Sequence, residues 1–168
     1  MPIHVFADNT LEYAGTRYRC ALGRGGIRSD KREGDGATPT GLYTLKRLYF
    51  RKDRGPTVAT GLPCTSISPD DGWCDDPAHP AYNRPVKLPF SAGHEKMWRN
   101  DALYDLVIEI SHNDNPPVPG AGSAVFIHVA KDDYAATEGC IALKKSDLVT
   151  LLAHWSTATT IEILDQPV

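Results

Sequence analysis

The chain has 168 residues, of which 23% are charged, and its formal net charge at neutral pH is −3. This length predicts one domain, spanning residues 1–168, that buries a core without needing disulfide bonds. The small negative charge excludes the dense basic surface that binds nucleic acid, and no segment approaches the roughly 20 apolar residues that cross a bilayer. We therefore expect a compact domain with no nucleic-acid partner and no transmembrane segment, and the composition leaves its oligomeric state open.

Six runs of the sequence are typical of β-strands, because they are rich in β-branched and aromatic residues and lie between clusters of Gly, Pro, Asn and Asp. They span residues 3–7, 16–22, 41–50, 104–110, 124–130 and 159–164. Basic residues cluster around segments 24–32 and 46–54 and are interspersed with Asp and Glu, so we interpret both segments as solvated surface. The pattern predicts an antiparallel, sheet-rich core, and hence a mainly β protein with minor α content (α+β).

Residues 55–100 form the longest irregular stretch and contain much of the aromatic and polar mixture of the chain. Loops of this length in a compact domain tend to form lids or binding walls. A purely structural alternative is that Trp73 and Trp98 fill the open side of the sheet. The sequence alone leaves both interpretations open.

The clearest helix is expected over residues 146–155. Ser146 is its expected N-cap, and Asp147 suits the positive end of the helix dipole. The apolar residues that follow fall on one helical face and predict core packing: Leu148, Leu151, Leu152 and Trp155. A weaker helical pattern covers residues 95–103.

A histidine and a cysteine stand in two neighbouring apolar runs. His128 lies in the run from Val125 to Val129, and Cys140 follows Gly139 at the start of the next. A free thiol has a pKa of about 8.5, so a thiol nucleophile needs a nearby base, and His128 would take its proton and return it to a leaving amine. Gly139 would permit a sharp turn and admit a carbonyl to the backbone amides of an oxyanion hole. The alternative is a buried cysteine and a core histidine without chemistry.

The segment from His128 to Leu143 resembles the signature of the YkuD-type L,D-transpeptidase catalytic domain, in which a histidine and a variable loop precede Ser/Thr-x-Gly-Cys and an aliphatic residue. The matching residues are His128, Thr137, Gly139, Cys140 and Ile141. The upstream segment Thr38-Pro39-Thr40-Gly41 resembles a second motif of the family, so the likeness covers nearly the whole chain. It implies a β-sandwich or barrel with one or two short helices packed on it.

The resemblance also implies the chemistry. Cys140 would be the nucleophile, His128 the general base and acid, and the backbone at Gly139 part of the oxyanion hole. The partners would be peptidoglycan stem tetrapeptides, which form a thioester that an amine resolves to a 3-3 cross-link or an exchanged D-amino acid. No metal and no organic cofactor is expected.

Two positions depart from the commonest pattern of the family. That pattern has a histidine two residues before the cysteine and an arginine two residues after it, where this chain has Glu138 and Ala142. Arg84 or Arg99 would have to supply the missing cation. By resemblance the long middle stretch would cover the groove, and the expected substrate-binding residues are Thr137, Glu138, Arg84, Tyr82, Trp73 and Trp98. The departures predict a divergent branch of the family and leave the substrate open.

The four cysteines do not settle the compartment of the protein. Cys64 and Cys74 flank a turn-rich segment and would close a loop in an oxidising compartment. Four residues that can bind metals lie close together in the sequence, but they lack the spacing of a zinc site: Cys74, Asp75, Asp76 and His79. The resemblance implies the cell envelope or periplasm, whereas the N-terminus shows no secretory signal, which leaves a cytoplasmic location open.

Three functions from different classes are consistent with these residues. The first is the L,D-transpeptidase. The second is a cysteine-dependent L,D-carboxypeptidase or amide hydrolase acting on wall fragments, which differs in passing the thioester to water. The third is a non-catalytic peptidoglycan-binding module, which would not need the thiol of Cys140.

Overall fold

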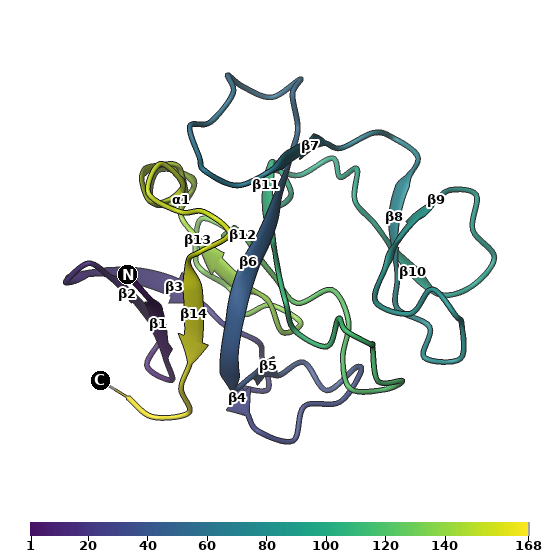
Figure 1. The fold of residues 1–168 in the computed structure, drawn as a ribbon, viewed down its shortest axis with the longest axis horizontal. Helices are drawn as coiled ribbons and strands as arrows, with labels where there is room; N and C mark the ends of the chain where they lie inside the picture. Colours follow the sequence, from purple (N-terminus) through teal and green to yellow (C-terminus); the bar gives the residue numbers. More distant parts are fainter. Residues whose placement is uncertain (168) are drawn as a thin grey trace.

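A closed β-barrel forms the centre of the molecule (Figure 1). The computed structural model describes residues 1–167. The barrel strands are β1 (Ile3–Phe6), β2 (Thr10–Tyr13), β3 (Thr16–Ala21), β6 (Gly41–Phe50), β11 (Leu106–Ile110), β12 (Phe126–Val129), β13 (Ile141–Leu143) and β14 (Thr160–Ile163). Their order is β11-β12-β13-β3-β2-β1-β14-β6, and pairing of β6 with β11 closes the ring. The short strand β7 (Cys64–Ser66) pairs with β6 outside it.

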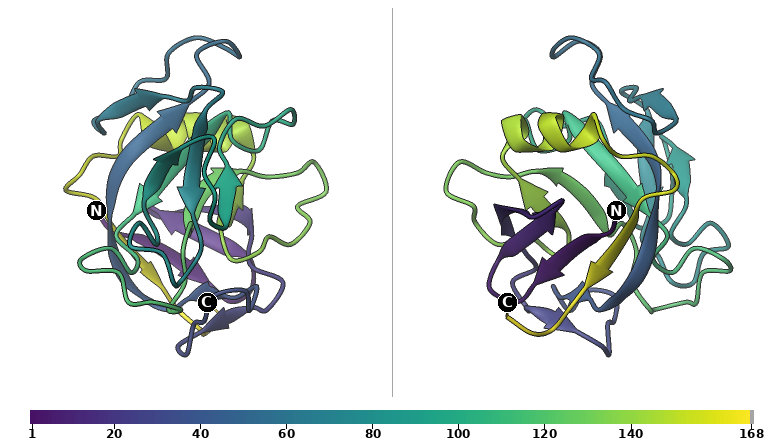
Figure 2. Two further views of the ribbon diagram at one scale, coloured as in Figure 1. Left: turned by 90° about the vertical axis from the view of Figure 1, so that its right-hand side faces the viewer. Right: turned by 60° about the vertical axis from the view of Figure 1, so that its left-hand side comes forward.

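The barrel interior holds the main hydrophobic core, because alternate strand residues point inward. Ile3, Val5, Ile127, Ile141 and their neighbours are fully buried there. Helix α1 (Lys145–Leu152) lies across one end of the barrel, as Figure 2 shows. It contributes to the same core a leucine face and the Trp155 that follows it: Leu148, Leu151, Leu152 and Trp155.

A second layer covers part of the outer barrel surface. It is built from β8 (Asp71–Cys74), β9 (Pro85–Lys87) and β10 (His94–Lys96), which form a small antiparallel sheet to one side of the barrel in Figure 1. A smaller apolar cluster lies beneath it, in which Trp73 packs edge-on against Phe126 of β12 with ring centroids 4.9 Å apart. This cluster includes Cys140, whereas the next residue, Ile141, belongs to the main core inside the barrel. The segment that carries the thiol is therefore packed on both faces of the barrel wall.

The structure confirms the mainly β fold class and corrects several details. Each of the six expected runs contains a barrel strand. The core is not purely antiparallel, because β1 pairs with β14 and β12 with β13 in parallel. Residues 95–103 are not helical; they hold the end of β10 and a series of bends.

The predicted helix at the C-terminal end is present as Lys145–Leu152, so it begins one residue earlier and ends three residues earlier than expected. Lys144 is its N-cap and provides no side-chain cap, so Ser146 lies inside the first turn. Asp147 occupies the first turn, as expected. Among residues 1–167 no helix is long and apolar enough to cross a membrane.

Candidate active site

Cys140 and His128 both face outward from the barrel, at the parallel pair β12 and β13. Ile127 is in register with Ile141, and His128 with Ala142. Since Ile127 and Ile141 point into the core, the alternation of side chains turns His128 and Cys140 outward. Both line a cavity of about 460 Å³ that is open to solvent on one side. The parallel pairing therefore brings the two candidate groups to one site.

The Cys140 thiol is held by two backbone groups. Its Sγ accepts a hydrogen bond from the N–H of Phe126 at 3.3 Å and donates one to the carbonyl of Ala124 at 3.2 Å. Burial raises the pKa of Cys140 to about 12, and the nearby Glu95 carboxylate adds to this, while the Phe126 N–H and the Lys31 ammonium oppose it. The resting group is therefore a neutral thiol at a fixed position, and it needs a base to become a nucleophile.

The His128 imidazole is fixed as one tautomer. Its Nδ1 lies 2.8 Å from the carbonyl oxygen of Val129, and because a carbonyl only accepts, Nδ1 carries the proton. Burial lowers the pKa of His128 to about 4, so the ring is neutral at physiological pH and Nε2 is left unprotonated. The ring of Tyr104 packs edge-on against the imidazole at 5.4 Å. This is the form that a general base requires.

The turn before Cys140 is built around the Thr137 hydroxyl. Thr137 Oγ1 donates to the carbonyl of Cys140 at 2.6 Å and accepts the N–H of Gly139 at 3.1 Å. Gly139 has a φ of +138°, and a Cβ at this position would lie 2.7 Å from the carbonyl oxygen of Ala37. Glycine is therefore required here, and the Thr137 hydroxyl is occupied in holding the turn.

The two motif segments, about 100 residues apart in the chain, are neighbours in space. Gly23 forms an isolated parallel bridge with Thr137 and donates its N–H to Thr38 Oγ1 at 2.9 Å. Thr38 is fully buried in the short strand β5 (Thr38–Pro39), which pairs with β4 (Ile27–Arg28). Through Gly23, the segment Thr38–Pro39 is thus linked to Thr137 at the start of the turn before Cys140.

The cavity walls carry charged residues that the sequence did not single out. Glu95 is half-buried, its loss of solvation raises its pKa, and it accepts a hydrogen bond from the Tyr104 hydroxyl. Glu33 accepts hydrogen bonds from the hydroxyls of Tyr82, at 2.7 Å, and of Ser123, at 2.6 Å. Lys31 lies in a segment that we interpreted as solvated, yet its side chain is only 9% exposed. Only the tertiary fold reveals these groups, because they come from segments far apart in the chain.

Five of the predicted site residues reach the cavity: Cys140, His128, Gly139, Thr137 and Glu138. Glu138 is on the rim, with its side chain 81% exposed and paired with Arg24 at 3.0 Å. Arg99, the second candidate for the missing motif cation, also lines the cavity and forms an ion pair with Asp101 at 2.6 Å.

The other expected substrate-binding residues are not among those that line the cavity. Arg84 donates to the backbone carbonyls of Asn83 and Asp114. Trp73 is buried and donates its Nε1–H to Asn83, so it fills the layer under β8. Trp98 is covered by the Arg51 guanidinium at 3.4 Å. Tyr82 is buried and approaches the site only through its bond to Glu33.

The cysteines are all free thiols, so the disulfide considered between Cys64 and Cys74 is not formed. Cys64 is exposed, whereas Cys20 and Cys74 are buried. Within residues 1–167 no group of three or more His, Cys, Asp or Glu side chains is arranged to hold a metal ion.

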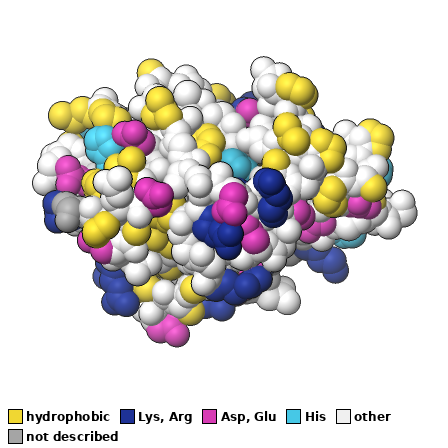
Figure 3. All heavy atoms as spheres, turned by 90° about the horizontal axis from the view of Figure 1, so that it is seen from below, with side chains coloured by type: hydrophobic (Ala, Val, Ile, Leu, Met, Phe, Trp, Pro, Cys, Tyr) yellow, Lys and Arg dark blue, Asp and Glu magenta, His cyan; other side chains and the backbone are white. Residues whose placement is uncertain are grey.

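On the face seen in Figure 3, basic and acidic side chains lie next to one another.

The fold and the cavity define a β-barrel protein with a neutral thiol and a neutral imidazole in one open site. Residues 4–163 match the family model of the YkuD L,D-transpeptidase catalytic domain, and the chain belongs to this family. No curated protein sequence matches the chain.

Several solved structures are similar to this chain at low sequence identity. They include the helical cell shape determining protein Pgp2 from Campylobacter jejuni (13% identity, TM-score 0.48, covering 99% of this chain and 48% of that one). Bd1075 from Bdellovibrio bacteriovorus follows (16% identity, TM-score 0.47, 98% and 47%). An L,D-transpeptidase from Mycobacterium smegmatis is also similar (12% identity, TM-score 0.44, 97% and 58%). The chain thus spans about half the length of these proteins.

Proposed function

We propose that the protein is an L,D-transpeptidase that uses Cys140 as its nucleophile and peptidoglycan stem tetrapeptides as acyl donors. One observation carries the proposal: Cys140 and His128 line the same cavity, and the His128 tautomer leaves Nε2 free to accept a proton. Membership of the YkuD family supports the substrate class. This substrate class implies action at the cell wall, and we propose a location in the cell envelope.

The first half-reaction forms a thioester. Cys140 Sγ attacks the carbonyl that follows the L-configured centre of diaminopimelate, while its proton passes to His128 Nε2. The tetrahedral intermediate then collapses: the bond from that carbonyl carbon to the terminal D-amino acid breaks, and His128 returns the proton to the leaving amine. Because both groups are neutral at rest, proton transfer accompanies the attack instead of preceding it.

The oxyanion of the intermediate is assigned to the N–H of Cys140. The resemblance assigns part of the oxyanion hole to the backbone at Gly139, but the Gly139 N–H is already donated to Thr137 Oγ1. Thr137 acts in this scheme as a positioning residue.

The second half-reaction reverses these steps with a new nucleophile. An amine donates its proton to His128 and attacks the thioester carbonyl, the C–S bond breaks, and the thiol of Cys140 is restored. The side-chain amine of a second diaminopimelate gives a 3-3 cross-link, a free D-amino acid gives exchange, and water gives carboxypeptidase action. The same thioester is thus common to transpeptidase and hydrolase activity.

Product analysis on purified tetrapeptide muropeptides tests the proposal. The wild-type protein is expected to release the terminal D-amino acid and to form cross-linked or exchanged products, whereas Cys140→Ala forms none and His128→Ala is severely slowed. Cys64→Ala is the matched control, because it removes an exposed thiol outside the site. Product formation by Cys140→Ala would refute the assigned nucleophile, and tripeptide as the only product would assign the protein as a hydrolase.

A further inference from the structure

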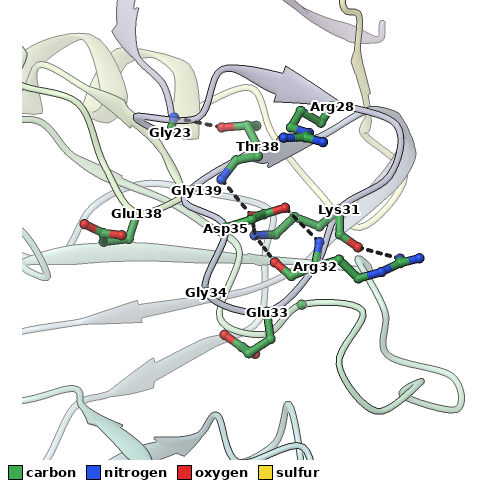
Figure 4. A network of polar contacts seen from close by, with 12 residues as sticks. Gly23, Arg28, Lys31, Arg32, Glu33, Gly34, Asp35, Thr38, Glu138 and Gly139 are labelled. Carbon is green, nitrogen blue, oxygen red and sulfur yellow. Dashed lines mark hydrogen bonds and ion pairs between the residues drawn. The ribbon is translucent and has the colours of Figure 1, made fainter.

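A lysine side chain is enclosed in the cavity wall beside the cysteine turn. Lys31 Nζ donates to Asp35 Oδ1 at 2.5 Å and to the carbonyl of Arg32 at 3.1 Å, as the close-up in Figure 4 shows. An ammonium group has three N–H donors, and among the described residues the third has no acceptor in the protein. Lys31 lines the cavity, so an ammonium that is only 9% exposed keeps one N–H without a protein acceptor beside it.

This ammonium lies near the position that a side chain at Gly139 would occupy. A Cβ built on Gly139 would be 3.6 Å from Lys31 Nζ, so the missing side chain leaves the cation next to the Gly139–Cys140 backbone. From the other side, a Cβ built on Gly122 would be 3.0 Å from Lys31 Cε. The side chain of Lys31 thus runs past two glycines, Gly122 along its stem and Gly139 at its ammonium group.

The counter-ion of Lys31 is itself fixed. Asp35 accepts the N–H of Arg32 at 2.8 Å and that of Ala37 at 2.9 Å, and Lys31 and these contacts hold its pKa at about 2. An ion pair as little exposed as Lys31–Asp35 contributes little to the stability of a protein, because both charges lose their hydration. Stability alone therefore does not account for a lysine at this place in the cavity wall. A fixed charge in a poorly solvated site acts on nearby charge more strongly than one in water.

We propose that Lys31 stabilises the negative charge that develops on Cys140 Sγ and on the acyl oxygen during thioester formation. This proposal rests on the proposed function, since it requires that Cys140 be acylated. Lys31 keeps its three protons throughout: the thiol proton passes to His128 and then to the leaving amine. In the free protein burial raises the pKa of Cys140, and the charge of the Lys31 ammonium opposes this effect.

Removing the cation and removing its counter-ion should change the reactivity of Cys140 in opposite directions. Lys31→Met removes the cation, so Cys140 should be alkylated by iodoacetamide more slowly across the alkaline range and acylated by a carbapenem roughly 10- to 100-fold more slowly, at or below the loss caused by deleting one direct oxyanion donor. Lys31→Arg should restore part of both rates. Asp35→Asn leaves the cation without its counter-ion and should make alkylation of Cys140 faster.

Lys87→Met is the matched control. Lys87 also pairs with an aspartate at 2.5 Å, through Asp71, but its side chain is 65% exposed and outside the cavity, and both rates should stay at the wild-type value. All variants carry Cys64→Ala, the modified cysteine is identified by peptide mass, and circular dichroism verifies folding.

Three results would overturn the role of Lys31. They are wild-type rates in folded Lys31→Met, an Arg variant no better than Met, or alkylation of Cys140 in Asp35→Asn that is unchanged or slower. If Lys31→Met does not fold, the Asp35→Asn result decides, because a purely structural pair would not accelerate the thiol when broken. Failure of the wild-type protein to form any carbapenem adduct would instead refute the proposed function.

Discussion

The hydroxyl of Thr137 offers a sharp test of how the cysteine turn is held. Thr137→Val keeps the shape of the side chain and removes both of its hydrogen bonds, to the carbonyl of Cys140 at 2.6 Å and from the N–H of Gly139 at 3.1 Å. A hydrogen bond contributes about 1 kcal/mol net, and a buried group left unpaired costs more, so we expect a loss of about 2 to 3 kcal/mol. For a domain of this size that corresponds to a melting temperature lower by roughly 4 to 12 °C.

Calorimetry and acylation kinetics measure the two consequences together. Because the Thr137 hydroxyl also sets the position of Cys140, Thr137→Val should acylate with a carbapenem at least about tenfold more slowly, since small displacements of a reacting group are costly. Thr137→Ser keeps the hydroxyl and should stay near the wild type in both measurements. A Val variant as stable and as fast as the wild type would show that these bonds do not hold the turn.

Three further predictions follow from the same geometry. In Gly23→Ala the new Cβ would lie 2.2 Å from the Gly36 carbonyl, so urea unfolding should show a loss of about 1 to 3 kcal/mol; an unchanged midpoint would contradict this close packing. The pKa of His128 falls from 6.5 to about 4 on folding, so the unfolded chain binds the proton first as the pH is lowered. The free energy of unfolding should therefore drop by about 3 kcal/mol as the pH falls from 6.5 to 4. His128→Gln should flatten that pH dependence, and an equally steep curve in the variant would exclude His128 as its source. Glu95→Gln removes a carboxylate that raises the pKa of Cys140, so alkylation of the thiol should become faster; a slower rate would contradict the assigned sign.

The fold was predicted best where a local pattern is strong. The strand Gly41–Phe50 coincides with its predicted run, because a long β-rich segment between turn residues has few alternatives. The leucine face of α1 was also evident from its spacing. The parallel pairing of β12 with β13 was not predicted, because the choice of neighbour depends on the path of the whole chain. That pairing is what brings His128 and Cys140 to one cavity.

Of the expected site residues, those of the cysteine motif and His128 line the cavity, whereas four of the six expected substrate-binding residues do not. Trp73 and Trp98 were expected to bind substrate, but Trp73 donates a hydrogen bond to Asn83 and Trp98 packs under the Arg51 guanidinium. The sequence could not show whether an aromatic residue of the stretch 55–100 packs in this way or belongs to a lid. Lys31 was interpreted as solvated because acidic neighbours surround it in the chain. Its burial arises from two glycines, Gly122 and Gly139, that lie about 90 and 108 residues further along and leave room for its side chain. Such long-range contacts leave no local signature.

The central claim is that Cys140 forms a covalent acyl adduct. Intact-protein mass spectrometry after incubation with a carbapenem under reducing conditions, followed by peptide mapping, measures this directly. We predict one adduct per chain located on Cys140, retained in Cys64→Ala and absent in Cys140→Ala. A wild-type protein that stays unmodified, or an adduct of equal yield in Cys140→Ala, would contradict the assignment of Cys140 as the nucleophile.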